Sequence, residues 1–149
     1  MAGLYYEQFE PGHVFRHAVR RTVTEMDNLL ITTLSMNTQP LHLDAEFAAG
    51  TEFGKPLVNS MFTLALVVGI TVTETTLGTT IGNLGFQEVR FPKPVFAGDT
   101  IHVETTVKGK RLSKSRSDCG IVDFEHHGYN QRGEVVCTCA RAALMKVQP

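Results

Sequence analysis

The residues that could do chemistry gather in one short segment, residues 34–44, with the sequence Leu-Ser-Met-Asn-Thr-Gln-Pro-Leu-His-Leu-Asp. It contains His42, and an imidazole with an unperturbed pKa near ~6.5 can take up and return a proton at neutral pH. Asn37 cannot accept a proton at neutral pH, but its amide can orient a water molecule or a hydroxyl group. Because Pro40 restricts the loop between these two residues, we expect acid–base chemistry at His42 with polar groups held beside it.

Short helices are predicted on both sides of this segment. Thr24 with Asp27 three residues later forms a weaker version of a capping box, which predicts a helix start, and apolar residues follow with helical spacing to position 34. The break at 37–40 ends that helix, so Asn37 is either its C-terminal cap or a site residue, and the two roles are compatible. Asp44 is suited to cap a short helix over 45–49, which Gly50 ends.

A longer helix is predicted over residues 59–70. This run is apolar on nearly all sides and begins with the polar pair Asn59-Ser60, which favours a buried helix over a strand. Asn59 and Ser60 are suited to cap the helix. The free backbone N–H groups of the same first turn carry partial positive charge, so they can also stabilise a developing negative charge.

The second half of the chain is predicted to form an antiparallel sheet. Strands are expected over 85–91, 100–108, 120–127 and 134–145, with a hairpin loop at 130–133. A further strand is expected near the N-terminus, over 13–20, from its alternation. One buried helix beside an antiparallel sheet is an α+β architecture, and 149 residues fit a single domain over 1–149.

Composition excludes several classes of function. The formal net charge is −1, which gives no electrostatic attraction to nucleic acid or to an anionic membrane. The longest apolar stretch, residues 61–70, is too short to span a bilayer. Residues 1–11 lack the apolar run of a signal peptide, and the three cysteines are an odd number. We therefore expect a cytoplasmic protein with reduced thiols.

Two other groups of residues have a structural and a functional interpretation. His126, His127, Cys137 and Cys139 lie on consecutive predicted strands, but their spacing is not that of a metal finger, so we expect no metal site. The basic run over 108–116 is expected to be a solvated hairpin, and the alternative is contact with the phosphates of a ligand.

The segment around His42 resembles the motif of MaoC-like, (R)-specific enoyl-CoA hydratases. That motif runs roughly Leu-Ser-Gly-Asp-x-Asn-Pro-x-His-x-Asp, then Phe-Ala, then Pro-[Ile/Val]-[Val/Ala]-His-Gly-Met, and the strand–turn segment over 90–100 is also similar. The resemblance implies a hot-dog fold, a homodimer or dimer of dimers, an acyl-CoA thioester substrate and no cofactor. The matching residues are Leu34, Ser35, Pro40, His42, Asp44, Phe47, Ala48, Pro56, Val58 and Met61.

The chain departs from this motif at defined positions. The family's catalytic Asp falls on Asn37 and its Asn on Gln39, while its His-Gly pair falls on Asn59-Ser60. The resemblance therefore implies His42 and Asn37 as catalytic residues and Gln39, Asn59 and Ser60 as substrate-binding residues. In general style the chain resembles family members that hydrate branched C5 dicarboxylyl-CoA thioesters such as mesaconyl-CoA and itaconyl-CoA.

Two other functions compete with hydration. Hot-dog thioesterases share the fold and place a carboxylate near the central helix, where this chain has Asn59-Ser60, with Glu46 and Glu52 nearby in sequence. A chain that lacks the family's Asp can also be a non-catalytic partner of an active hydratase subunit. The Asn at position 37 supports that alternative, and the retained His42 argues against it.

Overall fold

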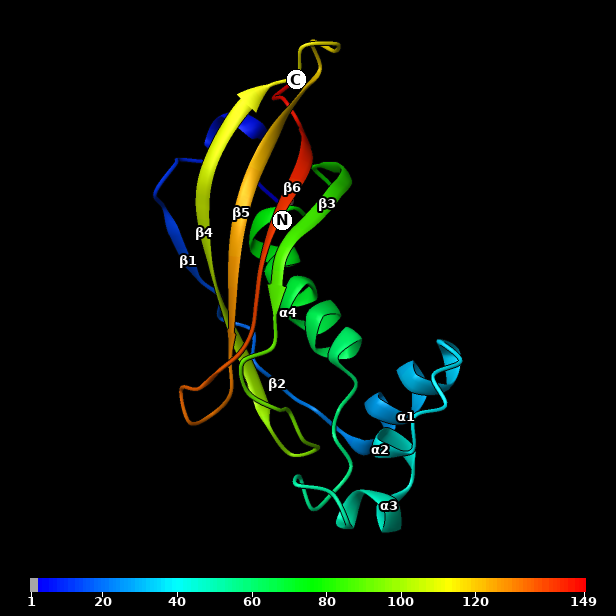
Figure 1. The fold of residues 1–149 in the computed structure, drawn as a ribbon. Coiled ribbons are helices and arrows are strands. Elements are labelled where there is room, and N and C mark those ends of the chain that lie inside the picture. The colour runs from blue at the N-terminus through cyan, green and yellow to red at the C-terminus, as the bar shows by residue number, and fades with distance from the viewer. Residues whose placement is uncertain (1–2) are drawn as a thin grey trace.

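An antiparallel sheet curved around one long helix forms the body of the protein (Figure 1). The computed structural model describes residues 3–149. The strands lie in the order β1-β4-β5-β6-β3, and β2 also pairs with β4. The strands are β1 (Val14–Arg16), β2 (Arg21–Thr22), β3 (Thr80–Arg90), β4 (Thr100–Leu112), β5 (Cys119–Tyr129) and β6 (Val135–Lys146). The helices are η1 (Tyr6–Gln8), α1 (Glu25–Leu34), α2 (Pro40–Leu43), α3 (Ala45–Ala49) and α4 (Ser60–Thr75).

The four strands predicted in the second half of the chain are confirmed. Strand β3 begins at Thr80, earlier than predicted, and its three register shifts against β6 hide the alternation there. Strand β4 continues to Leu112, beyond the predicted end at 108, although a bulge between Val107 and Gly109 shifts its register. A bulge reverses which side chains face the core, so the sequence pattern breaks although the strand continues.

The predicted strand over 13–20 is wrong as a single element. Strand β1 ends at Arg16, and β2 resumes only at Arg21. Between them the His17 N–H still bonds the Val103 carbonyl at 3.1 Å, while the His17 ring is buried against Glu74 of α4. The buried ring bends the chain out of the strand, and this contact is not visible in local alternation.

Helix α4 lies against the concave side of the sheet and buries only one face. Its buried residues include Thr63, Val67 and Ile70, whereas Ala65 and Gly69 on the opposite face are exposed. The helix approaches β5 so closely that a Cβ at Gly128 would lie 2.5 Å from Val67. The predicted helix is confirmed, but only one face of it is buried, because the sheet of the same chain covers that face alone.

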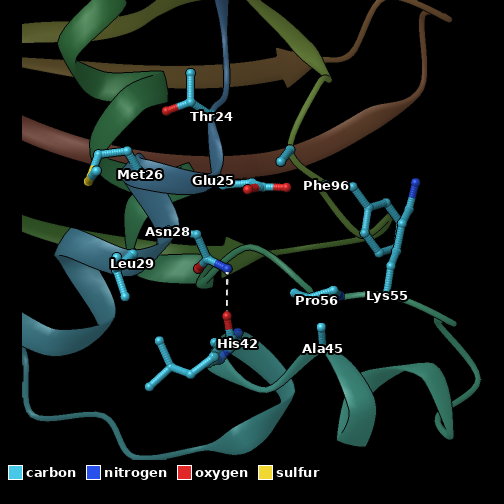
Figure 2. A pocket seen from close by; sticks show the side chains of 12 residues that line it. Thr24, Glu25, Met26, Asn28, Leu29, His42, Ala45, Lys55, Pro56 and Phe96 are labelled. Carbon is cyan, nitrogen blue, oxygen red and sulfur yellow. Dashed lines mark hydrogen bonds between the residues drawn. The ribbon is translucent and has the colours of Figure 1, made fainter.

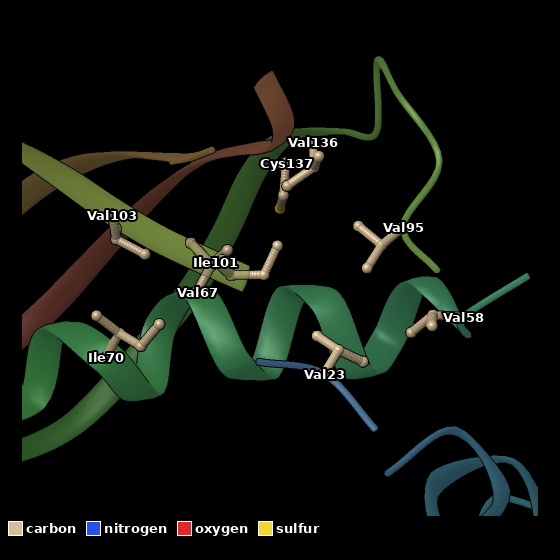
Figure 3. Close-up of a cluster of buried hydrophobic side chains, with 9 residues drawn as sticks. All are labelled: Val23, Val58, Val67, Ile70, Val95, Ile101, Val103, Val136 and Cys137. Carbon is tan, nitrogen blue, oxygen red and sulfur yellow. The ribbon is translucent and has the colours of Figure 1, made fainter. Parts of the chain in front are cut away.

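Two separate apolar clusters make up the core. One packs α4 residues such as Val67 and Ile70 against Ile101 and Val103 of β4 (Figure 3). The other lies around Phe124, toward η1, and its buried members are Phe9, Val107, Val122, Phe124, Ala143 and Met145.

Polar side chains, all buried except the partly exposed Glu74, join α4 to the three central strands. We call them the polar layer: Glu74, His17, Thr105, His126 and Arg141. Their bonds are Arg141 Nε to His126 Nε2, His126 Nδ1 to Thr105 Oγ1 and Thr105 Oγ1 to His17 Nε2, each 2.8 Å, and His17 Nδ1 to the Glu74 carboxylate. Guanidinium can only donate, so His126 Nε2 accepts and His126 Nδ1 carries the proton. The Thr105 hydroxyl then donates to His17, and His17 donates to Glu74. The donor of each of these four hydrogen bonds is thus assigned, and all four donate in the direction from Arg141 to Glu74.

The polar layer makes stability depend on pH. Burial, reinforced by the Arg141 charge, lowers the pKa of His126 to about 3, and burial also lowers the pKa of His17 despite the Glu74 carboxylate. Between pH ~6.5 and the lowered pKa of His126, this histidine is protonated in the unfolded state and neutral in the folded state. We therefore expect His126 to lower the free energy of unfolding by roughly 1 kcal/mol per pH unit as pH decreases through that window, and His17 to add to this decrease below its unfolded pKa.

Urea unfolding at a series of pH values measures this slope. The variant His126→Gln should flatten it, whereas His13→Gln, which changes an exposed histidine, should leave it unchanged. Equal slopes in wild type and His126→Gln would contradict the assignment of neutral His126.

Candidate functional site

Helix α1 begins as predicted and ends differently. Thr24 Oγ1 accepts from the Asp27 N–H at 3.2 Å, and Asp27 Oδ2 accepts from the Thr24 N–H at 2.8 Å, which confirms the capping box. At the other end Met36 has a φ of 55°, its N–H bonds the Thr33 carbonyl at 3.1 Å, and the Asn37 N–H bonds the Thr32 carbonyl at 2.9 Å. This is a Schellman ending, in which a left-handed residue follows the cap.

Asn37 is therefore not the helix cap, which is Ser35. The prediction of a capping role is wrong because Met36, rather than Asn37, adopts the left-handed conformation. The Asn37 side chain instead closes the loop, with Oδ1 accepting from the Gln39 N–H at 3.0 Å. Its amide nitrogen remains available for a further partner.

Helix α2 carries His42 in its last turn. Pro40 occupies the first helical position, and Gln39 before it is extended, with φ −64° and ψ 116°, as the proline predicts. His42 Nδ1 lies 2.7 Å from the Leu57 carbonyl oxygen. A carbonyl oxygen can only accept, so Nδ1 carries the proton, and the neutral ring leaves Nε2 as an unprotonated acceptor.

His42 lines a cavity of about 820 Å³ between α1, α2 and the loop that leads to α4 (Figure 2). Glu25 from the first turn of α1 lies on the same wall as Met26 and Leu29. Across the cavity the Lys55 ammonium group lies 4.5 Å from the centre of the Phe96 ring. The cavity thus combines an imidazole, a carboxylate and an ammonium group with apolar walls. The complete lining is Thr24, Glu25, Met26, Asn28, Leu29, His42, Leu43, Ala45, Lys55, Pro56, Phe96 and Ala97.

Asn28 connects the parts of this site and was missed by sequence reasoning. It is only 5% exposed, and its Nδ2 donates to the His42 carbonyl at 3.1 Å and to the Leu57 carbonyl at 3.0 Å. Its Oδ1 accepts from the Asn59 N–H at 2.9 Å. A buried Asn inside an amphipathic helix is unusual enough to draw attention, but the partners lie 14 to 31 residues away. No local pattern identifies them.

The N-terminus of α4 leaves one donor for a ligand. Asn59 caps the helix, with Oδ1 accepting from the Met61 N–H at 3.0 Å, and it is only 4% exposed. Its carbonyl accepts from the N–H groups of Phe62 and Thr63. Within residues 3–149, no group accepts from the Ser60 N–H. The predicted capping role of Asn59 is thus confirmed, and Ser60 supplies the available backbone donor.

The five predicted site residues do not all lie at the same cavity. His42 lines the large cavity, and Asn59 is joined to it through Asn28. Ser60 lines a separate cavity of about 280 Å³ with Phe53, Phe91 and Pro92. Asn37 and Gln39 line neither of these cavities; Asn37 is half-buried and Gln39 is exposed. A single chain therefore does not bring all five side chains to one surface.

The histidines and cysteines of β5 and β6 lie close together in the sheet. The register places His126 opposite Cys139, and all three cysteines are buried and free. Within residues 3–149, no three His, Cys, Asp or Glu side chains are close enough to hold a metal ion. No helix in this range has the length and apolarity to cross a membrane.

The basic run over 108–116 consists largely of paired side chains. Arg111 binds Asp123 at 2.6 Å, Arg116 binds Asp118 at 2.7 Å, and Lys108 lies 3.6 Å from Glu125. Lys110 donates to the carbonyls of η1. These pairs favour the solvated hairpin over a phosphate site.

Comparison with known proteins identifies the family. The family model described as a MaoC like domain matches residues 7–130. The chain belongs to this family. It is 34% identical to a mesaconyl-CoA hydratase of Cereibacter sphaeroides over 145 residues, which cover 97% of this chain and 42% of that protein. This MaoC-like chain thus spans less than half the length of the first curated relatives it matches.

Solved structures support the same family and give the fold. A MaoC-like dehydratase from Rhodospirillum rubrum matches with a TM-score of 0.84 and 33% identity over 99% of both chains. A Mycobacterium tuberculosis protein with a double hot-dog fold matches with a TM-score of 0.85 and 22% identity, covering 99% of this chain and 45% of that one. The MaoC-like chain therefore has the hot-dog fold that its sequence predicted.

The buried cap of α4 gives a direct test of the site's framework. We expect Asn59→Ala to lower the free energy of unfolding by about 1–3 kcal/mol, since it removes the cap of the Met61 N–H and one of the two bonds of the buried Thr32 hydroxyl. Thr33→Ala on the exposed side of α1 is the matched control and should change it by less than about 0.5 kcal/mol. Urea unfolding monitored by circular dichroism measures both, and equal effects would contradict the capping role.

Proposed function

We propose that this MaoC-like chain is an enoyl-CoA hydratase/dehydratase, a hydro-lyase that adds water reversibly to an α,β-unsaturated acyl-CoA. It acts as a single hot-dog domain in the cytoplasm, with a CoA thioester as substrate and no resident cofactor. The observation that carries this proposal is His42, which lines the 820 Å³ cavity and whose Nδ1 is held by the Leu57 carbonyl, so that Nε2 of the neutral ring is left as an unprotonated acceptor.

The chemistry requires one group that accepts and returns a proton. His42 Nε2 takes a proton from water as the water oxygen forms a bond to the β-carbon of the substrate. The electron pair of the carbon–carbon double bond moves toward the thioester oxygen and gives an enolate. That pair then returns to the α-carbon, which takes the proton from His42 Nε2–H. The product is a 3-hydroxyacyl-CoA, and the histidine is regenerated.

The developing charge and the water need partners of their own. The Ser60 N–H at the start of α4 is suited to the enolate oxygen, because it is unpaired and lies at the positive end of a helix. Asn37 would orient the attacking water through its free amide nitrogen. Gln39 and Asn59 complete the set of proposed substrate-binding residues, Asn59 by fixing the first turn that holds Ser60.

A branched C5 dicarboxylyl-CoA, such as mesaconyl-CoA or itaconyl-CoA, is the substrate class we propose. Support comes from the mesaconyl-CoA hydratase of Cereibacter sphaeroides among the relatives and from the residues at position 37 and position 55. Asn37 removes a negative charge that the family's Asp would place near an anionic acyl group. Lys55 brings a positive charge into the cavity wall.

The active unit is proposed to be a homodimer or a dimer of dimers. Apolar side chains on α1 and the following loop are uncovered, with Leu34 80% and Met36 86% exposed. The outer face of α4 and the edge strand β3 are also uncovered in one chain. Contiguous apolar surface and a free sheet edge favour pairing with a second copy.

Sedimentation velocity tests the proposed assembly. We expect at least a dimer at micromolar concentration, and we expect Leu34→Glu to weaken the assembly because it places a charge within the apolar surface. Glu7→Gln, which changes an exposed residue of η1, is the control. A wild-type protein that sediments as a monomer at this concentration would contradict the prediction.

An absorbance assay tests the reaction itself. Hydration of crotonyl-CoA, mesaconyl-CoA or itaconyl-CoA removes the thioester enone band without release of free thiol. Release of CoA, detected with a thiol reagent, would instead identify a thioesterase, for which Glu25, a residue that lines the cavity, is a carboxylate candidate. No loss of the band with any of the three substrates would favour the non-catalytic partner subunit.

His42→Ala should reduce the hydration rate by about 10²–10⁴-fold, because it removes the general acid–base group. The fold should persist, since the ring makes one hydrogen bond and lies at the edge of a cavity. His102→Ala, in strand β4, serves as the comparison for loss of a histidine outside the site. Activity close to wild type in His42→Ala would remove this residue from the mechanism.

The role of Asn37 is tested with two substrate classes, a simple enoyl-CoA (crotonyl-CoA) and the dicarboxylyl-CoA thioesters. Asn37→Ala should lower the rate on all substrates, because the attacking water loses its orientation. Asn37→Asp should shift the histidine limb of the pH–rate profile upward, since a nearby carboxylate favours the protonated ring. It should also lower activity on dicarboxylyl substrates relative to crotonyl-CoA by charge repulsion. An equal response of both classes would mean that Asn37 does not accommodate substrate charge.

A further inference from the structure

Asn28 uses its whole hydrogen-bonding capacity on the framework of the site. Its Nδ2 donates to two carbonyls, those of His42 and Leu57, and its Oδ1 accepts from the Asn59 N–H and, at 3.4 Å, from the Thr32 hydroxyl. A side-chain amide has two N–H donors and an oxygen with two lone pairs, so no capacity remains. Asn28 therefore lies where α1, α2 and the start of α4 meet.

One of these bonds bears directly on the proposed base. The Leu57 carbonyl oxygen accepts both from Asn28 Nδ2 at 3.0 Å and from His42 Nδ1 at 2.7 Å. The Leu57 N–H is also fixed, since it donates to the Leu41 carbonyl at 3.1 Å. The acceptor that selects the protonated nitrogen of His42 is thus held in place by Asn28.

We propose that Asn28 is a positioning residue for His42. By fixing the Leu57 oxygen and the His42 backbone together, it keeps the proton on Nδ1 and presents an unprotonated Nε2 to the cavity. Through its bond to the Asn59 N–H, the same amide sets the position of the first turn of α4 relative to that nitrogen. The expected effect on catalysis rests on the proposed function, whereas the effect on the His42 tautomer does not.

A purely structural role would have different consequences. Thr32 belongs to the same buried cluster, since its hydroxyl bonds Asn28 Oδ1 and accepts from Asn59 Nδ2 at 3.3 Å. Its side chain has no bond to His42 or Leu57. Thr32→Val therefore removes a buried polar group of the cluster without touching the acceptor of His42, which makes it the matched control.

The experiment reads the imidazole nitrogens by long-range ¹H–¹⁵N correlation spectroscopy of the full chain, with His42→Gln used to assign the signals. The wild-type ring, when neutral, should be protonated at Nδ1. Asn28→Ala and Asn28→Asp should increase the population protonated at Nε2, and Thr32→Val should not. A neutral wild-type ring protonated mainly at Nε2, or an unchanged tautomer in the Asn28 variants, would overturn the proposal.

Kinetics with mesaconyl-CoA and crotonyl-CoA give the second measurement. Both Asn28 variants should lower kcat by up to about 100-fold with little change in KM, because a misplaced base loses orientation but not binding. Asn28→Ser, which keeps a side-chain oxygen but neither amide N–H donor, is measured as well in case the first two variants do not fold. It should show the same tautomer change, and a wild-type tautomer there would overturn the proposal.

The two proposals fail in distinguishable ways. A wild-type protein that hydrates none of the substrates, but shows the expected tautomer change, would contradict the proposed function and leave the positioning role supported. An active wild type whose Asn28 variants lose stability but keep both the tautomer and kcat would contradict the positioning role alone.

Discussion

The buried N-terminus of α4 is the constraint on which the site depends. The first turn of a helix has N–H groups with no partner inside the helix, and burial without partners would be strongly unfavourable. The Asn59 side chain pairs with one of them, and the Asn59 N–H itself requires the oxygen of Asn28. Helix α1 must therefore lie against the start of α4, and the carboxamide of Asn28 then holds the chain on both sides of His42.

The opposite end of the molecule is held by the polar layer. It runs from Arg141 to Glu74 through side chains whose donors and acceptors are matched in one direction. Each of these five side chains is bonded within the layer, although Arg141 Nη2 has no partner among the described residues, and such a network specifies one packing of α4 on the sheet. The two ends of α4 are consequently fixed by polar contacts, and the apolar clusters provide the burial between and around them.

The same architecture explains why the proposed active site is incomplete in one chain. Helices α1, α2 and α3 gather at the start of α4, outside the curve of the sheet, and much of their apolar surface has no cover (Figure 1). Ser60 faces a different cavity from His42, and Asn37 lines neither. A second copy that covers this surface would bring further groups to the His42 cavity, which links the proposed assembly to the proposed chemistry.

The sequence by itself determined the features that depend on a few neighbouring residues. The start of α1 at Thr24, the extended Gln39 before Pro40 and the cap of α3 at Asp44 all follow from side chains within three positions. The motif around His42 also indicated the family and the hot-dog fold, which the comparisons confirm. The strands of the second half were visible because one face of the sheet is buried.

Only the tertiary structure decided the contacts between distant segments. Asn28 finds its backbone partners 14 to 31 residues away, His17 leaves its strand to reach Glu74, and Glu25 and Lys55 line one cavity with His42. The left-handed residue after α1 is Met36, although Asn37 is the residue type that prefers this conformation. Such choices are set by which groups become buried together, and burial depends on the whole fold rather than on local spacing.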